Sequence, residues 1–276
     1  MGTSTSSKGP AGGVSLDPPW LDDVIDGVGS GGDVVPPDDG ADTASPTVPP
    51  GIAPPNRYGD ARRAFGKFAK TGNTDQLRRA IGHYSSKGGG GAGASANRMR
   101  ASTSAGAALF SFLNAVGQGS TPEARQWVDN LRATNPSAED VVDAIVRELA
   151  PPGGSADEES LRDSMDHALS ELIKDNPTID PLSMGIDNIW ELMKGYLANE
   201  AGNRLCFDLG PIFENSQLDP RIAVQREREM RRFLKNEIGA HVDLLRNSVA
   251  NPSRSQLASI LQEALKITFE LFEADL

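Results

Sequence analysis

Apolar side chains recur at helical spacing from residue 57 to the end of the chain. Side chains three and four positions apart share one face of an α-helix, so each such stripe predicts an amphipathic helix. No strand-like alternation runs longer than a few positions, and no repeat period is evident. The pattern predicts an all-α, multi-helix domain over residues 57–276, with a joint between two subdomains near the Pro-Pro-Gly-Gly run at 151–154. The first stripes are Ala61, Ala64, Phe65 and Phe68, then Leu77, Ala80, Ile81 and Tyr84, then Ala124, Trp127, Val128 and Leu131.

Capping residues mark where these helices begin and end. Thr71-Gly72 closes the first helix, since glycine readily takes the left-handed conformation of a helix end. A short polar side chain before the first turn, or proline within it, is typical of a helix start. The predicted starts are Thr74, Thr121 with Pro122, the Ser155–Glu158 capping box, Asp219 with Pro220, and the Ser253–Gln256 capping box. The inward residues predicted behind the last three starts are Leu161, Met165, Leu169 and Leu172; Ile222, Met230, Phe233, Leu234, Ile238 and Leu245; and Leu257, Ile260, Leu261, Ala264, Leu265 and Leu271.

Residues 1–56 lack this periodicity and are predicted to form a long disordered Gly/Pro/Asp-rich tail. Recurring Pro-Pro pairs discourage both helices and sheet ladders, and few apolar side chains are present to build a core. One stretch differs, PPWLDDVIDGV at residues 18–28, because its apolar residues recur at helical spacing on a polar background. Such a pattern favours a docking segment for a partner protein. Its anchors are predicted as Pro19, Trp20 and Leu21.

The net charge of −11 is unevenly distributed along the chain. Residues 1–56 carry one base and eight acids, whereas residues 57–110 carry ten bases and two acids. The basic block between Arg57 and Arg100 could contact a phosphate backbone or an acidic protein. It could equally be an exposed helix face that attracts the acidic tail. No aromatic residues are interleaved with these bases as in an RNA-binding sheet, which argues against direct contact with nucleic acid.

A glycine-rich run, KGGGGAGASANRMRAS, begins at Lys87. The Lys-Ser/Thr pair that touches phosphate and magnesium in a Walker motif does not follow these glycines. No predicted strand precedes Gly88, as a dinucleotide fingerprint requires. The run is therefore predicted to be a flexible loop between helices. Small residues on the helix that follows it, at Ser102, Gly106 and Ala107, indicate close helix packing.

No catalytic or metal-binding constellation is apparent. His83, His167 and His241 lie on three separate predicted helices, and none belongs to a zinc-binding pattern. The single cysteine, Cys206, excludes an internal disulfide framework and is predicted to be a small buried thiol. No Gly-x-Ser-x-Gly motif is present. We expect a protein that is not an enzyme and needs no cofactor or metal.

The amino terminus offers different chemistry. Gly2 becomes the first residue once the initiator methionine is trimmed, and an α-amine has a pKa of about 7.7–8.0, against about 10.4 for lysine. It is therefore the best nitrogen nucleophile of the chain. The absence of a side chain on Gly2, and the small residues Thr3, Ser4, Thr5 and Ser6 behind it, would let this end enter a narrow pocket of another enzyme.

Two membrane-related alternatives are disfavoured. Gly2 and Ser6 satisfy the N-myristoylation pattern, but an acidic tail would be repelled by an anionic lipid surface. The first twenty residues lack the apolar core of a signal peptide, and no later stretch reaches about 18 apolar residues. We expect a cytoplasmic protein without membrane contact.

Three stretches resemble the QatB family, the B components of bacterial Qat anti-phage defence systems. They are MGTSTSSKGP with the later PPW, RYGDARRAFGKFAKTGN at residues 57–73, and GASANRMRASTSAGAALF at residues 93–110. The resemblance is placed in the first half of the chain, and the remainder looks like a generic helical domain. It implies partners within the same system: an ATPase, a QueC-like enzyme and a TatD-like nuclease.

This resemblance suggests that Gly2 is a modification acceptor. QueC-type enzymes activate the carboxylate of a 7-deazaguanine with ATP and let a nitrogen nucleophile attack it, and the Gly2 amine could be that nucleophile. Residues 3–7 would then enter the enzyme pocket, and Trp20 with its neighbours would dock. Three alternatives remain: a helical scaffold that bridges the ATPase and the nuclease, a nucleic-acid adaptor that uses the basic block, and an uninvolved leader.

Overall fold

The computed structural model describes residues 57–150, 155–209, 218–249 and 252–276. Across these ranges it contains ten α-helices, one π-helical turn and no strand, which confirms the all-α prediction. The predicted disordered tail at 1–56 and the predicted joint at 151–154 lie outside the described residues. The elements are α2 (Gly59–Thr71), α3 (Thr74–His83), η1 (Tyr84–Gly88), α4 (Ala92–Asn97), α5 (Arg100–Gln118), α6 (Pro122–Ala133), α7 (Ala138–Leu149), α8 (Ala156–Asp175), α9 (Ile186–Leu209), α11 (Pro220–Arg246) and α12 (Arg254–Ala274).

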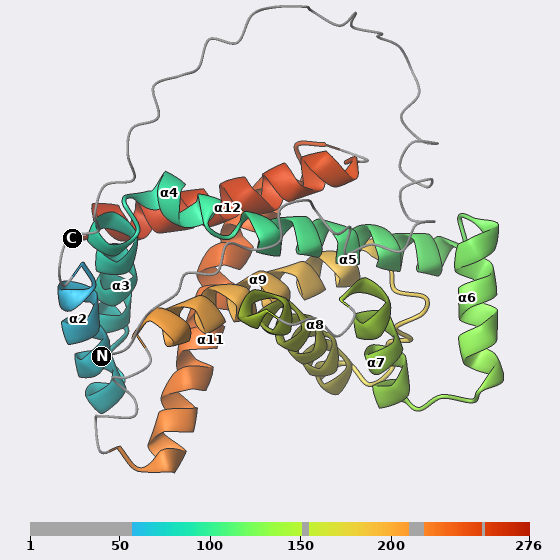
Figure 1. Ribbon diagram of the computed structural model, residues 1–276, viewed down its shortest axis with the longest axis horizontal. Coiled ribbons are helices and arrows are strands. Elements are labelled where there is room, and N and C mark those ends of the chain that lie inside the picture. Colours follow the sequence, from blue (N-terminus) through green and yellow to red (C-terminus); the bar gives the residue numbers. More distant parts are fainter. Residues whose placement is uncertain (1–56, 151–154, 210–217, 250–251) are drawn as a thin grey trace, which may run out of the picture.

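Helices α5, α9 and α12 form the centre of the molecule. α5 runs along the longest axis of the molecule. The pair α2 and α3 lies at one end of the molecule, and α6 lies at the other end (Figure 1). α9 packs against α5, α8 and α11, while α12 packs against α3, α4, α5 and α11. The buried apolar side chains form one continuous cluster that takes members from each of these helices.

Close packing at the centre depends on small residues of α5. A Cβ atom on Gly106 would lie 2.9 Å from Tyr196 Cε1 on α9 and 3.1 Å from Leu261 Cδ1 on α12. Tyr196 is fully buried beside it and donates a 2.9 Å hydrogen bond from its hydroxyl to the Ser102 carbonyl. The close packing predicted around Ser102, Gly106 and Ala107 is therefore confirmed.

Most predicted inward positions are buried, but two are wrong. Ile222 is 40% exposed because it lies in the first turn of α11, at the end of this helix that projects beyond the other helices (Figure 1). Leu271 is 39% exposed because it is off the stripe through which α12 meets its neighbours. Thr268 lies on that stripe instead, and its hydroxyl contacts His241 Nδ1 at 2.9 Å and donates to the Ala264 carbonyl at 2.7 Å.

The predicted helix starts are confirmed with one shift. Both predicted capping boxes, at Ser155 and Ser253, are formed. The side chain that caps α3 belongs to Asn73 and not to Thr74, because the Asn73 carboxamide accepts hydrogen bonds from the Asp75 and Gln76 amides. A third capping box, between Ser137 and Asp140 at the start of α7, was not predicted.

The prediction of a flexible loop through the glycine-rich run is wrong for most of that run. The chain turns at Gly90 and Gly91, whose φ angles of 85° and 99° suit glycine, and then forms α4. Ala92 and Ala96 are buried, and α4 packs against α12. The small residues of this run therefore allow close contact between helices.

Candidate functional site

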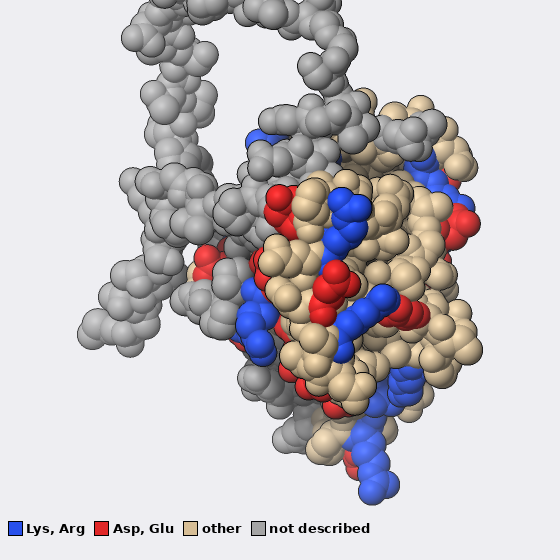
Figure 2. Space-filling view, turned by 90° about the vertical axis from the view of Figure 1, so that its right-hand side faces the viewer, with Lys and Arg blue, Asp and Glu red and all other residues tan. Residues whose placement is uncertain are grey.

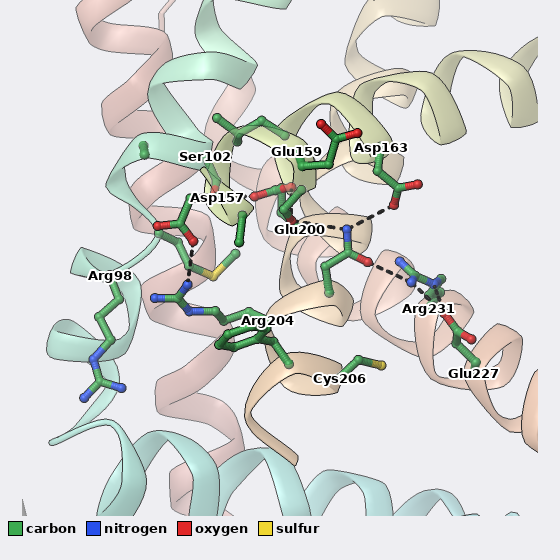
Figure 3. Close-up of a pocket in the computed structure, with 17 residues that line it drawn as sticks. Arg98, Ser102, Asp157, Glu159, Asp163, Glu200, Arg204, Cys206, Glu227 and Arg231 are labelled. Carbon is green, nitrogen blue, oxygen red and sulfur yellow. Dashed lines mark hydrogen bonds and ion pairs between the residues drawn. The ribbon is translucent and has the colours of Figure 1, made fainter. Parts of the chain in front are cut away.

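The residues predicted to be functional, Gly2, Thr3, Ser4, Thr5, Ser6, Pro19, Trp20 and Leu21, lie outside the described residues. The structure shows a different candidate, a pocket of about 650 Å³. Its walls come from the start of α5, the first turns of α8, the second half of α9 and the middle of α11 (Figure 3). A pocket of this size matches the sites that bind small molecules.

A buried carboxylate, that of Glu200 on α9, lies at one wall of the pocket (Figure 3). Glu200 is 5% exposed and accepts hydrogen bonds from the hydroxyls of Ser102 on α5, at 2.6 Å, and Ser160 on α8, at 3.2 Å. Burial raises the pKa of this carboxyl, and the serine hydrogen bonds oppose the rise only in part. Glu200 thus joins three helices through one side chain.

A second network crosses the pocket from α11. The Arg231 guanidinium donates to Glu227 Oε1 at 2.7 Å and to Asn203 Oδ1 on α9 at 2.8 Å. The Asn203 amide nitrogen in turn donates to Ser164 Oγ at 3.1 Å and to Asp163 Oδ2 at 3.3 Å on α8. These hydrogen bonds hold α8, α9 and α11 in register around the pocket.

The opposite wall carries two further guanidinium groups. Arg204 on α9 pairs with Asp157 on α8 at 3.2 Å, and its Nε atom is buried without a hydrogen-bond partner. Arg98, just before α5, donates to the carbonyls of Gly88 at 3.4 Å and Gly89 at 2.9 Å. The glycine-rich run is thereby tied to the rim of the pocket.

A tyrosine pair lies beside this wall. The rings of Tyr58 and Tyr84 stack with centroids 5.3 Å apart, and their hydroxyls donate to Asp208 Oδ2 on α9, at 3.5 Å and 2.7 Å. Burial and the nearby Asp208 carboxylate raise the pKa of Tyr84, so this phenol stays protonated. The pair fixes the point where the described chain begins against the end of α9.

Cys206 and Phe207 complete the lining. Cys206 is partly buried, and burial raises the pKa of its thiol to about 11, so the thiol form predominates at neutral pH. This agrees with a packing thiol, although the residue is less buried than predicted. Phe207 is 75% exposed at the pocket, where it offers an apolar surface to a ligand or partner.

The charged groups of the pocket are engaged within the protein. Each charged side chain in its lining has a hydrogen-bond or ion-pair partner within the protein. As predicted, the three histidines lie on separate helices, α3, α8 and α11, and none lines the pocket. The described residues contain no cluster of side chains suited to hold a metal ion.

Ser102 and Cys206 were predicted as packing residues, but no sequence pattern placed them in one pocket with Glu200 and Arg231. Glu200 follows Asn199 in GYLANEAG, a stretch that is otherwise apolar or small, and an acid there is a signal of a buried carboxylate. Arg231 gave no such signal, because α11 carries many charged residues that look alike in sequence.

The basic block predicted between Arg57 and Arg100 is partly neutralised by the protein itself. Arg63 and Lys87 pair with Asp60 at 3.1 Å and 2.7 Å, and Arg78 pairs with Glu237 and Asp275. Within the ranges that the structure describes, no ion pair is found for Lys67, Lys70, Arg79 or Arg100.

The end of the molecule formed by α6 and α7 has no charge of a single sign. On this face, acidic and basic side chains alternate on a largely uncharged surface (Figure 2). In the described part of the chain, none of the helices has the length and apolar character that a bilayer crossing needs.

One comparison with known proteins gives a match. A family model described as Qat anti-phage system associated protein QatB matches residues 90–272. The matched range includes residues 93–110 and the pocket lining from Arg98 to Arg231, but begins after residues 57–73. The likeness therefore lies mainly in the helical body, which corrects the expectation that the first half carries it. No curated protein and no solved structure matches the chain.

Proposed function

The chain belongs to the QatB family of the Qat anti-phage system, and from this premise we propose that it is a non-catalytic component whose Gly2 amine accepts a 7-deazaguanine-type group. The acceptor and the docking segment lie in the tail, residues 1–56, and the helical body, residues 57–276, holds partners of the same system. The joint near 151–154 would divide this body into two subdomains.

One observation carries the non-catalytic part of this proposal. The charged groups around Glu200 already have hydrogen-bond or ion-pair partners within the protein, and the Cys206 thiol is protonated at neutral pH. A cysteine nucleophile needs a lowered pKa, whereas burial raises the pKa of the Cys206 thiol. The arrangement supports binding, with the reactive group elsewhere in the chain.

The proposed conjugation is an acyl transfer to the Gly2 amine. A QueC-like partner would join the 7-deazaguanine carboxylate to ATP, releasing pyrophosphate and leaving an acyl adenylate. The neutral Gly2 nitrogen attacks the acyl carbon, a C–N bond forms, the bond to AMP breaks, and the amine proton passes to a base. Near pH 7.5 a substantial fraction of an α-amine is neutral, whereas a lysine is almost wholly protonated.

The tail supplies the parts that such an enzyme would grip. Thr3, Ser4, Thr5 and Ser6 are small enough to follow Gly2 into a narrow pocket. The apolar anchors Pro19, Trp20 and Leu21 would dock on the partner surface, since they stand out against a polar background.

Intact-mass measurement after co-expression with the QueC-like partner tests the proposal. We expect a mass increase on the wild-type chain, and none when one residue is inserted between Met1 and Gly2. Lys8→Arg is the matched control, because Lys8 is the other amine within residues 1–56, and this variant should still gain the mass. An unchanged wild-type mass, or a gain lost in Lys8→Arg, contradicts Gly2 as the acceptor.

The second candidate is a helical scaffold that bridges the ATPase and the TatD-like nuclease of the system. It is favoured by the basic side chains of α2 and α3 that have no ion pair in the described structure, because they could contact an acidic partner or nucleic acid. Deletion of residues 2–20 separates the two candidates. A scaffold should keep its partners and its protective effect, whereas a conjugation substrate should lose protection.

A further inference from the structure

A small groove of about 150 Å³ lies between α2 and α3, at the end of the molecule where the described chain begins. Its polar lining consists of Asp60, Arg63 and Lys67 from α2 and Gln76, Arg79 and His83 from α3. Asp60 is already engaged by Arg63 and by Lys87 of η1. The groove therefore carries an excess of positive charge.

Two of these cations are available to an incoming anion. Lys67 and Arg79 are exposed, and neither has an ion pair among the described residues. His83 lines the same groove, and its Nδ1 atom is buried without a hydrogen-bond partner. The volume admits a carboxylate side chain but is below the roughly 300–1,000 Å³ of sites for small molecules.

We propose that this groove binds the acidic segment at residues 33–42 of the same chain. This segment, DVVPPDDGAD, carries four carboxylates and no base. The Pro-Pro pair at 36–37 favours an extended backbone, so the side chains of Asp38 and Asp39 can enter a shallow groove without helix formation. Lys67 and Arg79 are the cations that they pair with.

The tether is long enough for this contact. Fifteen positions separate Asp42 from Arg57, and a flexible chain of that length has an r.m.s. end-to-end distance of about 20 Å. Lys67 lies ten residues after Arg57 along the chain, which corresponds to about 15 Å at 1.5 Å per helical residue. The tethered segment is thus held at a local concentration in the millimolar range, which compensates for the weak individual ion pairs.

Docking of residues 33–42 leaves residues 1–32 outside the contact. The proposal therefore does not depend on modification of Gly2. The contact would hold residues 33–42 of the tail against α2 and α3. The contact would also shield Lys67 and Arg79 from nucleic acid, because carboxylates of the chain itself occupy the groove.

The titration of His83, followed by NMR on the full chain, tests this contact. Burial lowers the pKa of His83, and Lys87, Arg79 and Arg63 lower it further, while Asp60 raises it. Carboxylates docked in the groove raise it as well. The test variant is D33N/D38N/D39N/D42N, and its matched control is D17N/D22N/D23N/D26N, which removes the same charge from the more distant part of the tail.

We expect the pKa of His83 to fall in the test variant and to stay at the wild-type value in the control. His167 and His241, on α8 and α11, should be unchanged in both and serve as internal references. High salt should bring wild type and test variant together, since exposed charges are screened. Both variants leave the helical body untouched, so folding is not at issue. The proposal is overturned if the pKa of His83 in the test variant equals that of the wild type, or if it shifts equally in the control. It is also overturned if this pKa responds to added duplex DNA but not to the aspartate substitutions.

Discussion

The Glu200 carboxylate accepts a 2.6 Å hydrogen bond from the Ser102 hydroxyl, and the two residues, 98 positions apart in sequence, are both buried. Ser160 donates a second hydrogen bond to the same carboxylate from α8. Burial raises the pKa of this carboxyl, because it penalises the charged form more than the serine hydroxyls stabilise it. The contact of Glu200 with Ser102 and Ser160 therefore holds α5, α8 and α9 together with a strength that depends on pH.

Glu200→Gln should remove that dependence. The pKa of Glu200 is raised by folding, so the wild type is most stable with respect to this group below the unfolded pKa, and loses stability as pH rises through the folded value. Glutamine cannot ionise and keeps a similar shape. Urea unfolding at several pH values should show the variant gaining stability relative to wild type as pH rises. A constant difference from pH 4 to pH 8 would show that Glu200 is not perturbed.

Gly106→Ala should destabilise the helical body by about 1–3 kcal/mol, although alanine is the better helix former by about 1 kcal/mol. The added Cβ would lie 2.9 Å from Cε1 of the Tyr196 ring, which is fully buried. The matched control is Gly93→Ala on α4, where a Cβ meets nothing within 4 Å. The urea midpoint should fall for Gly106→Ala and stay or rise for Gly93→Ala. Equal effects would mean that α5 does not approach α9 this closely.

Gly72→Ala should cost about 1–2 kcal/mol for a separate reason. Gly72 ends α2 with a φ angle of 70°, a conformation that alanine adopts poorly. Its added Cβ would also lie 2.6 Å from the Arg226 guanidinium, whose Nε donates to the Ala69 carbonyl at 3.3 Å. Gly72→Asn tests which cause dominates, because asparagine tolerates this φ angle but still meets Arg226. Thermal unfolding should rank glycine above asparagine and asparagine above alanine if the backbone conformation decides.

Local signals in the sequence predicted the helices well. The capping boxes at Ser155 and Ser253 involve residues three positions apart, so their geometry is written into a few neighbouring residues. The shift from Thr74 to Asn73 is a choice between adjacent capping residues, both of which suit a helix start. Ile222 was misplaced because helical spacing shows which residues share a face, but not how far the helix extends beyond its neighbours.

The pocket could not be predicted in the same way. Ser102, Ser160, Glu200 and Arg231 come from four helices, and only the tertiary packing of α5, α8, α9 and α11 brings them together. The glycine-rich run was misread for a related reason. Small residues are typical both of a loop and of close helix contact, and the contact between α4 and α12 decides between them.

The chain has one cysteine, which makes its reactivity a direct probe of the pocket. Burial raises the pKa of the Cys206 thiol to about 11, and only the thiolate reacts with iodoacetamide. An unperturbed thiol has a pKa of about 8.5, so at pH 7.5 the folded protein should react on the order of 100-fold more slowly than free cysteine. Unfolding in urea should restore the ordinary rate. A fast reaction of the folded protein would show that the thiol is open to solvent. It would also remove one support for a pocket that binds without a cysteine nucleophile.

Glu227→Gln tests the electrostatic part of this effect. The Glu227 carboxylate adds to the rise in the pKa of Cys206, whereas Arg231 opposes it. Loss of the acid should therefore speed the reaction with iodoacetamide, although to a smaller extent than unfolding does.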